Sequence, residues 1–295
     1  MSGGRRRVRA TFWLLEAPDS LAEQSRRNPD GYGIATFEDD GAPKIQKRPA
    51  AAYEDELFAR EAKKEESATF LAHVRYASTG KKTLENTHPF EQDGRTFAHN
   101  GHLEGLDVLE DRLGSSYREL VRGDTDSERM FALITKEIDT AGGDVEAGIV
   151  AALDWIARAL PLYAINFVLA DTTDVWALRY PEPNPLLMLE RAIGGRSGAR
   201  HLDAASPAGT VRVRSGALAK RAAVLFASEQ MDEDTGWRSL EVGELVHVDG
   251  DLNVESRIAL DGPPAHQLTL EDLGVDAAAS QRDPRKARAG AGAAP

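Results

Sequence analysis

The chain has 295 residues, a formal net charge of −12 and a hydrophobic fraction of 41%. Such an acidic protein is poorly suited to nucleic acid or to an anionic membrane surface, because both attract positive charge. It contains no cysteine, which excludes disulfides, thiolate metal sites and a cysteine nucleophile among these residues. The length allows one large domain or two small ones. Because no apolar run is long enough for a membrane span or a signal peptide, we expect a cytoplasmic protein.

The chain opens with residues 1–9, which are small and basic and do not resemble a strand that starts a buried sheet. Residues 10–27 are expected to be helical or irregular. Clustered Asn, Pro, Asp and Gly then predict a turn, and alternation predicts a strand and a hairpin partner. A charged helix with an apolar side follows. These four elements are expected at 28–33, 34–37, 44–48 and 53–66.

Residues 69–77 alternate in the manner of a strand, so that neighbouring side chains face opposite sides. Leu71, His73 and Arg75 share one face. If this face looks inward, a guanidinium projects into a cavity, where burying it without an anion would be costly. A carboxylate matches its planar fork. The alternative is a surface arginine or a structural ion pair.

A second short strand, 96–99, ends in Asn100-Gly101. This dipeptide is first of all a turn signal. The alternative is an oxyanion hole, because an asparagine amide and an accessible glycine N–H are two donors suited to a developing negative charge.

The remaining chain predicts two central helices between two sets of strands. After a short helix at 103–113, a capping box at 125–128 opens one amphipathic helix, and a second follows at 145–160. Strands dominate afterwards. Strands that are not interleaved with the helices favour a layered α+β domain. The later strands are expected at 163–170, 174–180, 186–191, 211–214, 222–228, 243–249 and 253–259.

Four motifs occur in a defined order, at 73–80, 86–90, 98–101 and 123–128. Together they resemble the glutaminase domain of class II glutamine amidotransferases, which are N-terminal nucleophile (Ntn) hydrolases. The resemblance spans roughly residues 10–250 and is strongest to stand-alone amidotransferase-like proteins. It implies a four-layer αββα sandwich of α+β class that cleaves the side-chain amide of glutamine or a γ-glutamyl compound without a cofactor. A separate synthase that accepts ammonia is a partner it allows.

The resemblance also assigns roles to individual residues. Arg75 would bind the α-carboxylate of the substrate and Asp126 its α-amino group, although a carboxylate at a helix start is also explained by the helix dipole. Asn100 and Gly101 would form the oxyanion hole. The remaining candidate substrate-binding residues are Ser78, Thr79 and His88.

The histidines do not indicate a metal centre. The spacing of His73, His88, His99 and His102 matches no helical zinc pattern, and there are no thiolates to complete a site. We therefore expect these side chains to line a core or a pocket.

The family nucleophile, an N-terminal cysteine, is missing from this sequence. Three explanations remain open. The true start lies upstream with Met-Cys, or the chain is a non-catalytic binding or regulatory module, or Ser2 replaces the cysteine. We prefer these explanations in the order given. The retained Arg75, Asn100, Gly101 and Asp126 favour an upstream start, and Gly3-Gly4-Arg5 is a poor buried strand on which to place Ser2.

The domain organisation expected from these patterns has three parts. Residues 1–260 form the amidotransferase domain and 261–275 an extension packed on its edge. Residues 276–295 are rich in Ala, Gly, Arg and Pro and are expected to be a disordered tail.

Overall fold

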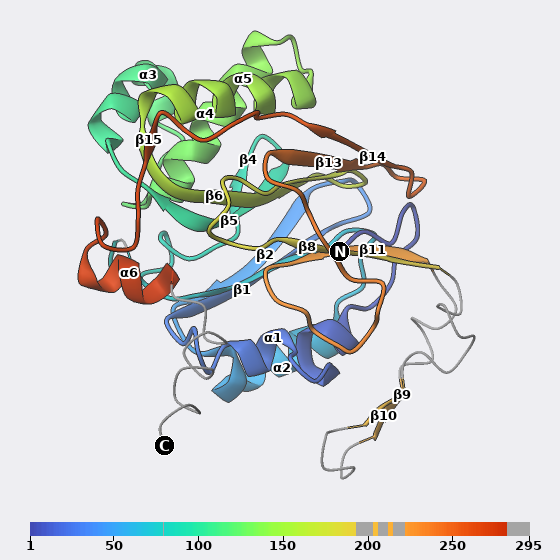
Figure 1. Cartoon of the computed structure of the whole chain (residues 1–295). Coiled ribbons are helices and arrows are strands. Elements are labelled where there is room, and N and C mark those ends of the chain that lie inside the picture. Colours follow the sequence, from blue (N-terminus) through green and yellow to red (C-terminus); the bar gives the residue numbers. More distant parts are fainter. Residues whose placement is uncertain (79, 193–202, 206–211, 215–221, 282–295) are drawn as a thin grey trace.

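The computed structural model describes residues 1–78, 80–192, 203–205, 212–214 and 222–281. Two layers of β-sheet lie face to face, and each is covered on its outer side by helices (Figure 1). This is the four-layer αββα sandwich predicted from the sequence. Among the described residues, no helix has the length and apolar character that crossing a membrane requires.

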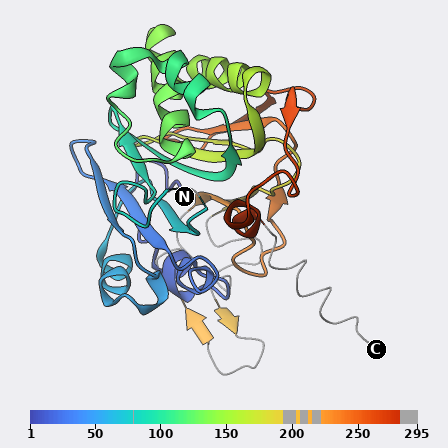
Figure 2. The same ribbon diagram turned by 90° about the vertical axis from the view of Figure 1, so that its left-hand side faces the viewer.

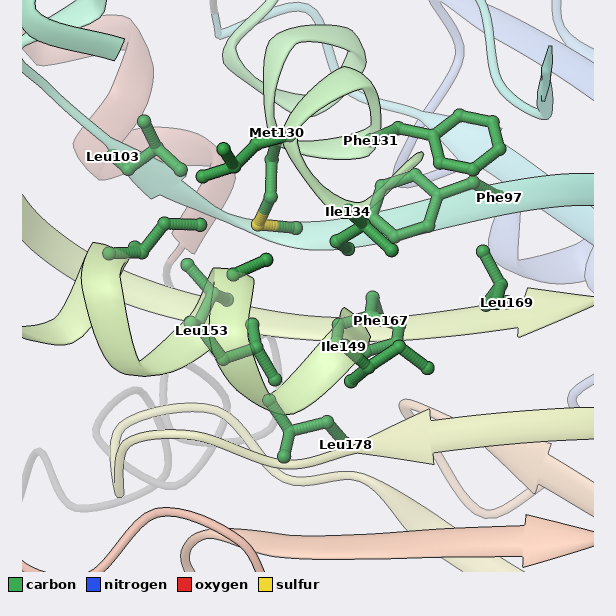
Figure 3. Packing of buried hydrophobic residues seen from close by; sticks show 14 of the residues in the cluster. Phe97, Leu103, Met130, Phe131, Ile134, Ile149, Leu153, Phe167, Leu169 and Leu178 are labelled. Carbon is green, nitrogen blue, oxygen red and sulfur yellow. The ribbon is translucent and has the colours of Figure 1, made fainter. Parts of the chain in front are cut away.

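The larger sheet has the order β14-β13-β7-β6-β5-β4, and β15 adds to β6 in parallel. Its outer face is covered by α3 (Leu106–Arg118), α4 (Asp126–Thr140) and α5 (Val145–Ala159). Phe97, Phe167 and Leu178 pack here against Phe131 and Ile149 (Figure 3). The strands are β4 (Phe90–Gln92), β5 (Arg95–Leu103), β6 (Pro161–Ala170), β7 (Val175–Leu178), β13 (Glu244–Val248), β14 (Val254–Ile258) and β15 (His266–Gln267).

The second layer consists of two three-stranded sheets, β2-β1-β3 and β11-β8-β12. Their outer faces pack against η1 (Phe12–Glu16), α1 (Leu21–Gln24) and α2 (Glu56–Lys64), with η2 (Ala52–Glu54) preceding α2. The strands are β1 (Gly31–Phe37), β2 (Pro43–Arg48), β3 (Leu71–Arg75), β8 (Leu187–Arg191), β11 (Ala223–Ala227) and β12 (Arg238–Ser239). β9 (Asp203–Ala205) pairs with β10 (Arg212–Arg214).

The alternation predicted for β3 is confirmed. Phe70, Ala72 and Val74 pack toward the helices of the second layer. Leu71 faces the other way, against Ala98 of the larger sheet. The inner face of β3 therefore looks into the space between the two sheets.

The N-terminus joins the two small sheets. Ser2 is 1% exposed, lies opposite Thr69 beyond the start of β3, and exchanges two backbone hydrogen bonds with Val224 of β11. The prediction that residues 1–9 do not resemble part of a buried sheet was therefore wrong for Ser2. Its small side chain and Gly3 fit between two strand edges, and the basic residues come later.

Several boundaries also differ from the predictions. The helix start predicted at Thr125 is confirmed, because the Thr125 hydroxyl accepts the Glu128 N–H at 3.3 Å. The predicted capping box is incomplete, since Glu128 Oε2 accepts the N–H of Gly123 and not that of Thr125. The helix predicted at 103–113 begins only at Leu106, since β5 continues through Leu103. The tail predicted from residue 276 is wrong for its first part, where α6 (Val275–Gln281) buries Ala277 and Ala278. Residues 282–295 lie outside the described part.

Candidate active site

A cavity of about 320 Å³ lies between the two sheet layers, at the ends of β3 and β5 and the start of α4. The structure brings six of the eight predicted site residues to its wall. Thr79 lies outside the described residues, and Ser2 does not line this cavity. The six are Arg75, Ser78, His88, Asn100, Gly101 and Asp126.

Arg75 ends β3 on its inner face and is only 4% exposed. Its guanidinium donates to the backbone carbonyls of Lys81 at 3.1 Å and Gly80 at 3.5 Å. Burial lowers the pKa of Arg75, while the negative charges of Asp30 and Asp126 oppose that shift. The interpretation of Arg75 as a surface residue is therefore wrong, and a buried cation forms part of the cavity wall.

Asp126 is the first residue of α4 and is 5% exposed. Its Oδ2 accepts the backbone N–H of Leu103 at 3.1 Å, which fixes the carboxylate against the end of β5. Asp126 and Arg75 therefore line the same cavity as an anion and a cation.

Asn100 and Gly101 lie inside β5 and do not form the predicted turn, because pairing with Asn166 and Ile165 of β6 continues the strand. The N–H of Ile165 donates to the Tyr180 carbonyl, on the side of β6 that faces away from β5. Ile165 and Gly101 are therefore a non-hydrogen-bonded pair of the β5–β6 ladder. The N–H and C=O of Gly101 consequently point away from β6. The Asn100 side chain makes no hydrogen bond with any residue that the structure describes.

Position 101 requires glycine because of a close approach. A Cβ atom there would lie 1.9 Å from the carbonyl oxygen of Ala164 on β6, well inside van der Waals contact. The strand can therefore present an unobstructed backbone N–H at this point only with glycine.

Three histidines surround these groups. The rings of His73 and His88 stand 4.3 Å apart. His99 Nε2 lies 3.3 Å from the Ala164 carbonyl, which can only accept, so Nδ1 accepts from the Ser127 hydroxyl at 2.9 Å. Burial lowers the pKa of His88 and of His99, and that of His73 to about 3. In the described ranges, no three His, Asp or Glu side chains are grouped to hold a metal ion.

The buried imidazole of His88 makes acid stability testable. Its folded-state pKa lies well below 6.5, chiefly because burial disfavours the charged ring, so below that pH the unfolded chain binds a proton that the folded chain does not. The free energy of unfolding should therefore fall as the pH drops below about 6.5, by up to ~1.4 kcal/mol per pH unit from this group.

Urea denaturation at about pH 7, 6 and 5 would measure that slope, and His88→Asn is expected to reduce it. His266→Asn, at an exposed position of β15, is the matched control and should retain the slope of the unmodified chain. Equal slopes for His88→Asn and the unmodified chain would contradict the assignment.

A second cavity of about 150 Å³ adjoins the first and shares His73, His99 and Asn100 with it. This second cavity, called the slot below, lies between two strand edges. One edge is formed by residues 70–73, at the start of β3, and the other by residues 225–228, at the end of β11. Residues of β5, β6, η1 and α1 also line it, and so does Met1.

The slot continues the path of the N-terminal residues. Met1 and Phe70 exchange two backbone hydrogen bonds, of 2.8 and 2.9 Å. Burial lowers the pKa of the Met1 α-amino group to about 5. Within the described part of the chain, β3 pairs only with β1, and β11 only with β8 and Ser2. In these described residues, the edges along Leu71–Val74 and Phe226 therefore have no strand partner on the side of the slot.

Ser2 lines neither cavity, and its hydroxyl accepts the Gly4 N–H at 3.2 Å. Its position therefore gives no support to a serine nucleophile. Sequence reasoning missed Gln281 and Asn184, which also line the larger cavity. No local pattern marks them, because a distant loop and α6 bring them to the wall.

The family model for class-II glutamine amidotransferases matches residues 19–267. The chain belongs to the class-II glutamine amidotransferase family. Among relatives, an uncharacterized protein of Methanocaldococcus jannaschii is 38% identical over 127 residues, covering 41% of this chain and 34% of that protein. A protein of Saccharomyces cerevisiae named "Probable glutamine amidotransferase" is 29% identical over 162 residues, covering 48% and 45%. The chain thus spans less than half the length of these two relatives.

Solved structures show the same fold as this chain. A glutamine aminotransferase class-II domain protein from Silicibacter pomeroyi has a TM-score of 0.53 at 19% identity, covering 78% of this chain and 92% of that one. The glutamine phosphoribosylpyrophosphate amidotransferase of Bacillus subtilis has a TM-score of 0.59 at 21% identity, covering 86% and 48%. At these identities the likeness concerns the Ntn-hydrolase fold alone.

Proposed function

We propose that the larger cavity binds the α-amino acid end of glutamine or of a γ-glutamyl compound and is built to cleave its side-chain amide. The observation that carries this proposal is that two buried side chains of opposite charge, Arg75 and Asp126, line the same cavity as Asn100 and Gly101. An α-amino acid presents the complementary charges, a carboxylate and an ammonium group.

Recognition would divide between the two charges. The planar fork of Arg75 suits the α-carboxylate, and Asp126 accepts from the α-ammonium group. Both residues are already held by backbone contacts, to Lys81 and to Leu103 respectively. Little ordering is then required on binding, which favours affinity.

Amide cleavage would place the developing oxyanion at Asn100 and Gly101. A thiol adds to the amide carbon, and the negative charge on oxygen is stabilised by the Asn100 amide and the Gly101 N–H. The C–N bond then breaks, the thiol proton passes to the leaving nitrogen, and ammonia or an amine departs. Water hydrolyses the resulting γ-glutamyl thioester and restores the thiol.

The thiol is absent from these 295 residues. The slot beside Met1 supports the explanation that a cysteine lies upstream of Met1. We propose that a strand preceding Met1 occupies the slot and carries a cysteine. Because Met1 lies opposite Phe70 in an antiparallel pair, the fifth preceding residue would lie opposite Arg75. Residues opposite Leu71, His73 and Arg75 share the inner face, so that side chain would face the larger cavity.

The recognition step can be tested without a nucleophile. We expect the 295-residue chain to bind glutamine in titration calorimetry. Asp126→Asn, which keeps an acceptor for the Leu103 N–H, should weaken glutamine binding about 10- to 100-fold. Arg75→Lys should weaken it similarly, because the bidentate fork is lost.

Two analogues separate the roles. Glutaramate lacks the α-amino group, so its affinity should not change in Asp126→Asn. 4-Aminobutanamide lacks the α-carboxylate, so its affinity should not change in Arg75→Lys. Arg95→Met is the matched control, since this mostly buried arginine of β5 lines neither cavity. Failure of the unmodified chain to bind glutamine, or equal losses for all three ligands, would contradict the proposal.

The alternative function is a non-catalytic module that binds an amino acid or regulates a partner. The absence of cysteine from these residues favours it. Glutamine binding that persists without amide cleavage, even after a thiol-bearing strand is added, would support this alternative. For the catalytic function, a separate synthase would be the acceptor of ammonia, and a cytoplasmic location is proposed with it.

A further inference from the structure

The C-terminal helix α6 lies beyond residues 19–267, the part that the family model matches. It sits at the edge of the sandwich, level with the space between the two sheets (Figure 2). Ala279, Ser280 and Gln281 line the larger cavity together with Leu270 of the preceding segment. An element outside the matched region thus forms part of the candidate active-site wall.

The helix is fixed to β6 by a small apolar cluster. Leu273, Ala277 and Ala278 are buried against Tyr163 and Ala164 of β6. Ala164 lies opposite His102 of β5, next to the pair formed by Ile165 and Gly101. The preceding chain is tied to the same strand, because Leu268 donates its N–H to Leu162 at 2.8 Å. These contacts hold the end of α6 at a defined position on the cavity wall.

Gln281 connects α6 to the candidate oxyanion site. It is 9% exposed, and its Nε2 donates to the Gly101 carbonyl at 3.2 Å. Its Oε1 accepts from Asn184 Nδ2 at 2.7 Å. The carbonyl of Asn184 in turn accepts from Asn166 at 3.0 Å, and Asn166 lies opposite Asn100 on β6. A chain of amide hydrogen bonds therefore links the Gly101 carbonyl to Asn166, the residue opposite Asn100.

We infer that Gln281 is a positioning residue for the oxyanion site, acting through the Gly101 carbonyl. The N–H and C=O of a strand residue lie on the same edge, so a donor that holds the Gly101 carbonyl also sets the direction of the Gly101 N–H. At this point of β5 the edge has no neighbouring strand among the described residues, because β4 pairs only with residues 95–97. Gln281 supplies the constraint that a neighbouring strand would otherwise provide.

The first test reads the Gly101 carbonyl directly and needs no ligand. The sequence contains a single Gly-His pair, Gly101-His102. Labelling glycine with ¹³C at the carbonyl and histidine with ¹⁵N therefore gives one correlated NMR signal for this peptide group. Gln281→Ala and Gln281→Glu should shift this signal, because both remove the donor. Val275→Ala, at the exposed start of α6, should leave it in place. An unmoved signal in both Gln281 variants would overturn the inference.

The second test rests on the proposed function and compares glutamine with norvaline, an amino acid that lacks the side-chain carbonyl. Gln281→Ala should reduce the preference for glutamine over norvaline about five- to tenfold, the size of one lost hydrogen bond. A merely structural role would lower both affinities equally, and that outcome would overturn the inference. If neither amino acid binds even to the unmodified chain, the proposed function fails, while the NMR signal still decides whether Gln281 positions Gly101.

Discussion

A chain with five residues added before Met1, the first of them cysteine once the initiator methionine is removed, is expected to hydrolyse glutamine. The 295-residue chain is expected to release no ammonia from it. The added strand would enter the slot and place the cysteine opposite Arg75, on the inner face of the sheet. A coupled assay for ammonia should show a rate at least about 10³-fold above that of the shorter chain, the order of a restored nucleophile.

The matched control has four added residues, again beginning with cysteine. The cysteine then lies opposite Val74, whose side chain packs toward the helix layer, so the thiol faces away from the cavity. This chain should bind glutamine and remain at background rate. Equal rates for the two extended chains would contradict the register, and two inactive chains that bind glutamine would contradict the placement of the thiol in this slot.

Gly101→Ala is expected to destabilise the fold by at least ~3 kcal/mol. The new methyl group would lie 1.9 Å from the Ala164 carbonyl oxygen, so β5 and β6 must separate at the centre of the larger sheet. Overpacking of a rigid core costs ~1–3 kcal/mol even where side chains can adjust, and here the neighbour is backbone. Urea denaturation measures the effect as a lower midpoint.

Gly274→Ala provides the comparison. No atom lies within 4 Å of a Cβ at position 274, so its free energy of unfolding should change by less than about 1 kcal/mol. A Gly101→Ala protein as stable as Gly274→Ala would show that β5 can move away from β6 at little cost.

Local sequence patterns predicted those elements in which apolar and polar side chains alternate or a side chain caps a helix. The inner face of β3 and the start of α4 could be read from the sequence, because two-residue alternation and a Thr-to-Glu capping box are properties of neighbouring residues. Four ordered motifs then pointed to the residues of one cavity. The roles of those residues remain predictions.

Long-range pairing explains what could not be predicted. Asn100-Gly101 is a turn signal by itself, but β6 pairs with β5 on both sides of it and extends the strand. Residues 1–3 lack the side chains that are typical of a buried strand, yet Ser2 pairs with Thr69 and with Val224, which are distant in the sequence. Gln281 and Gly101 are 180 positions apart in the sequence, and no pattern of neighbouring residues predicts their hydrogen bond.

The enclosed amine of Met1 has a practical consequence for how the protein is handled. This amine donates to Phe70 at 2.8 Å and Met1 lines the slot, so a purification tag fused there would begin beside the slot. Such a tag would stand in the place of the proposed strand and could change the property under assay. Tags are therefore better attached after residue 295.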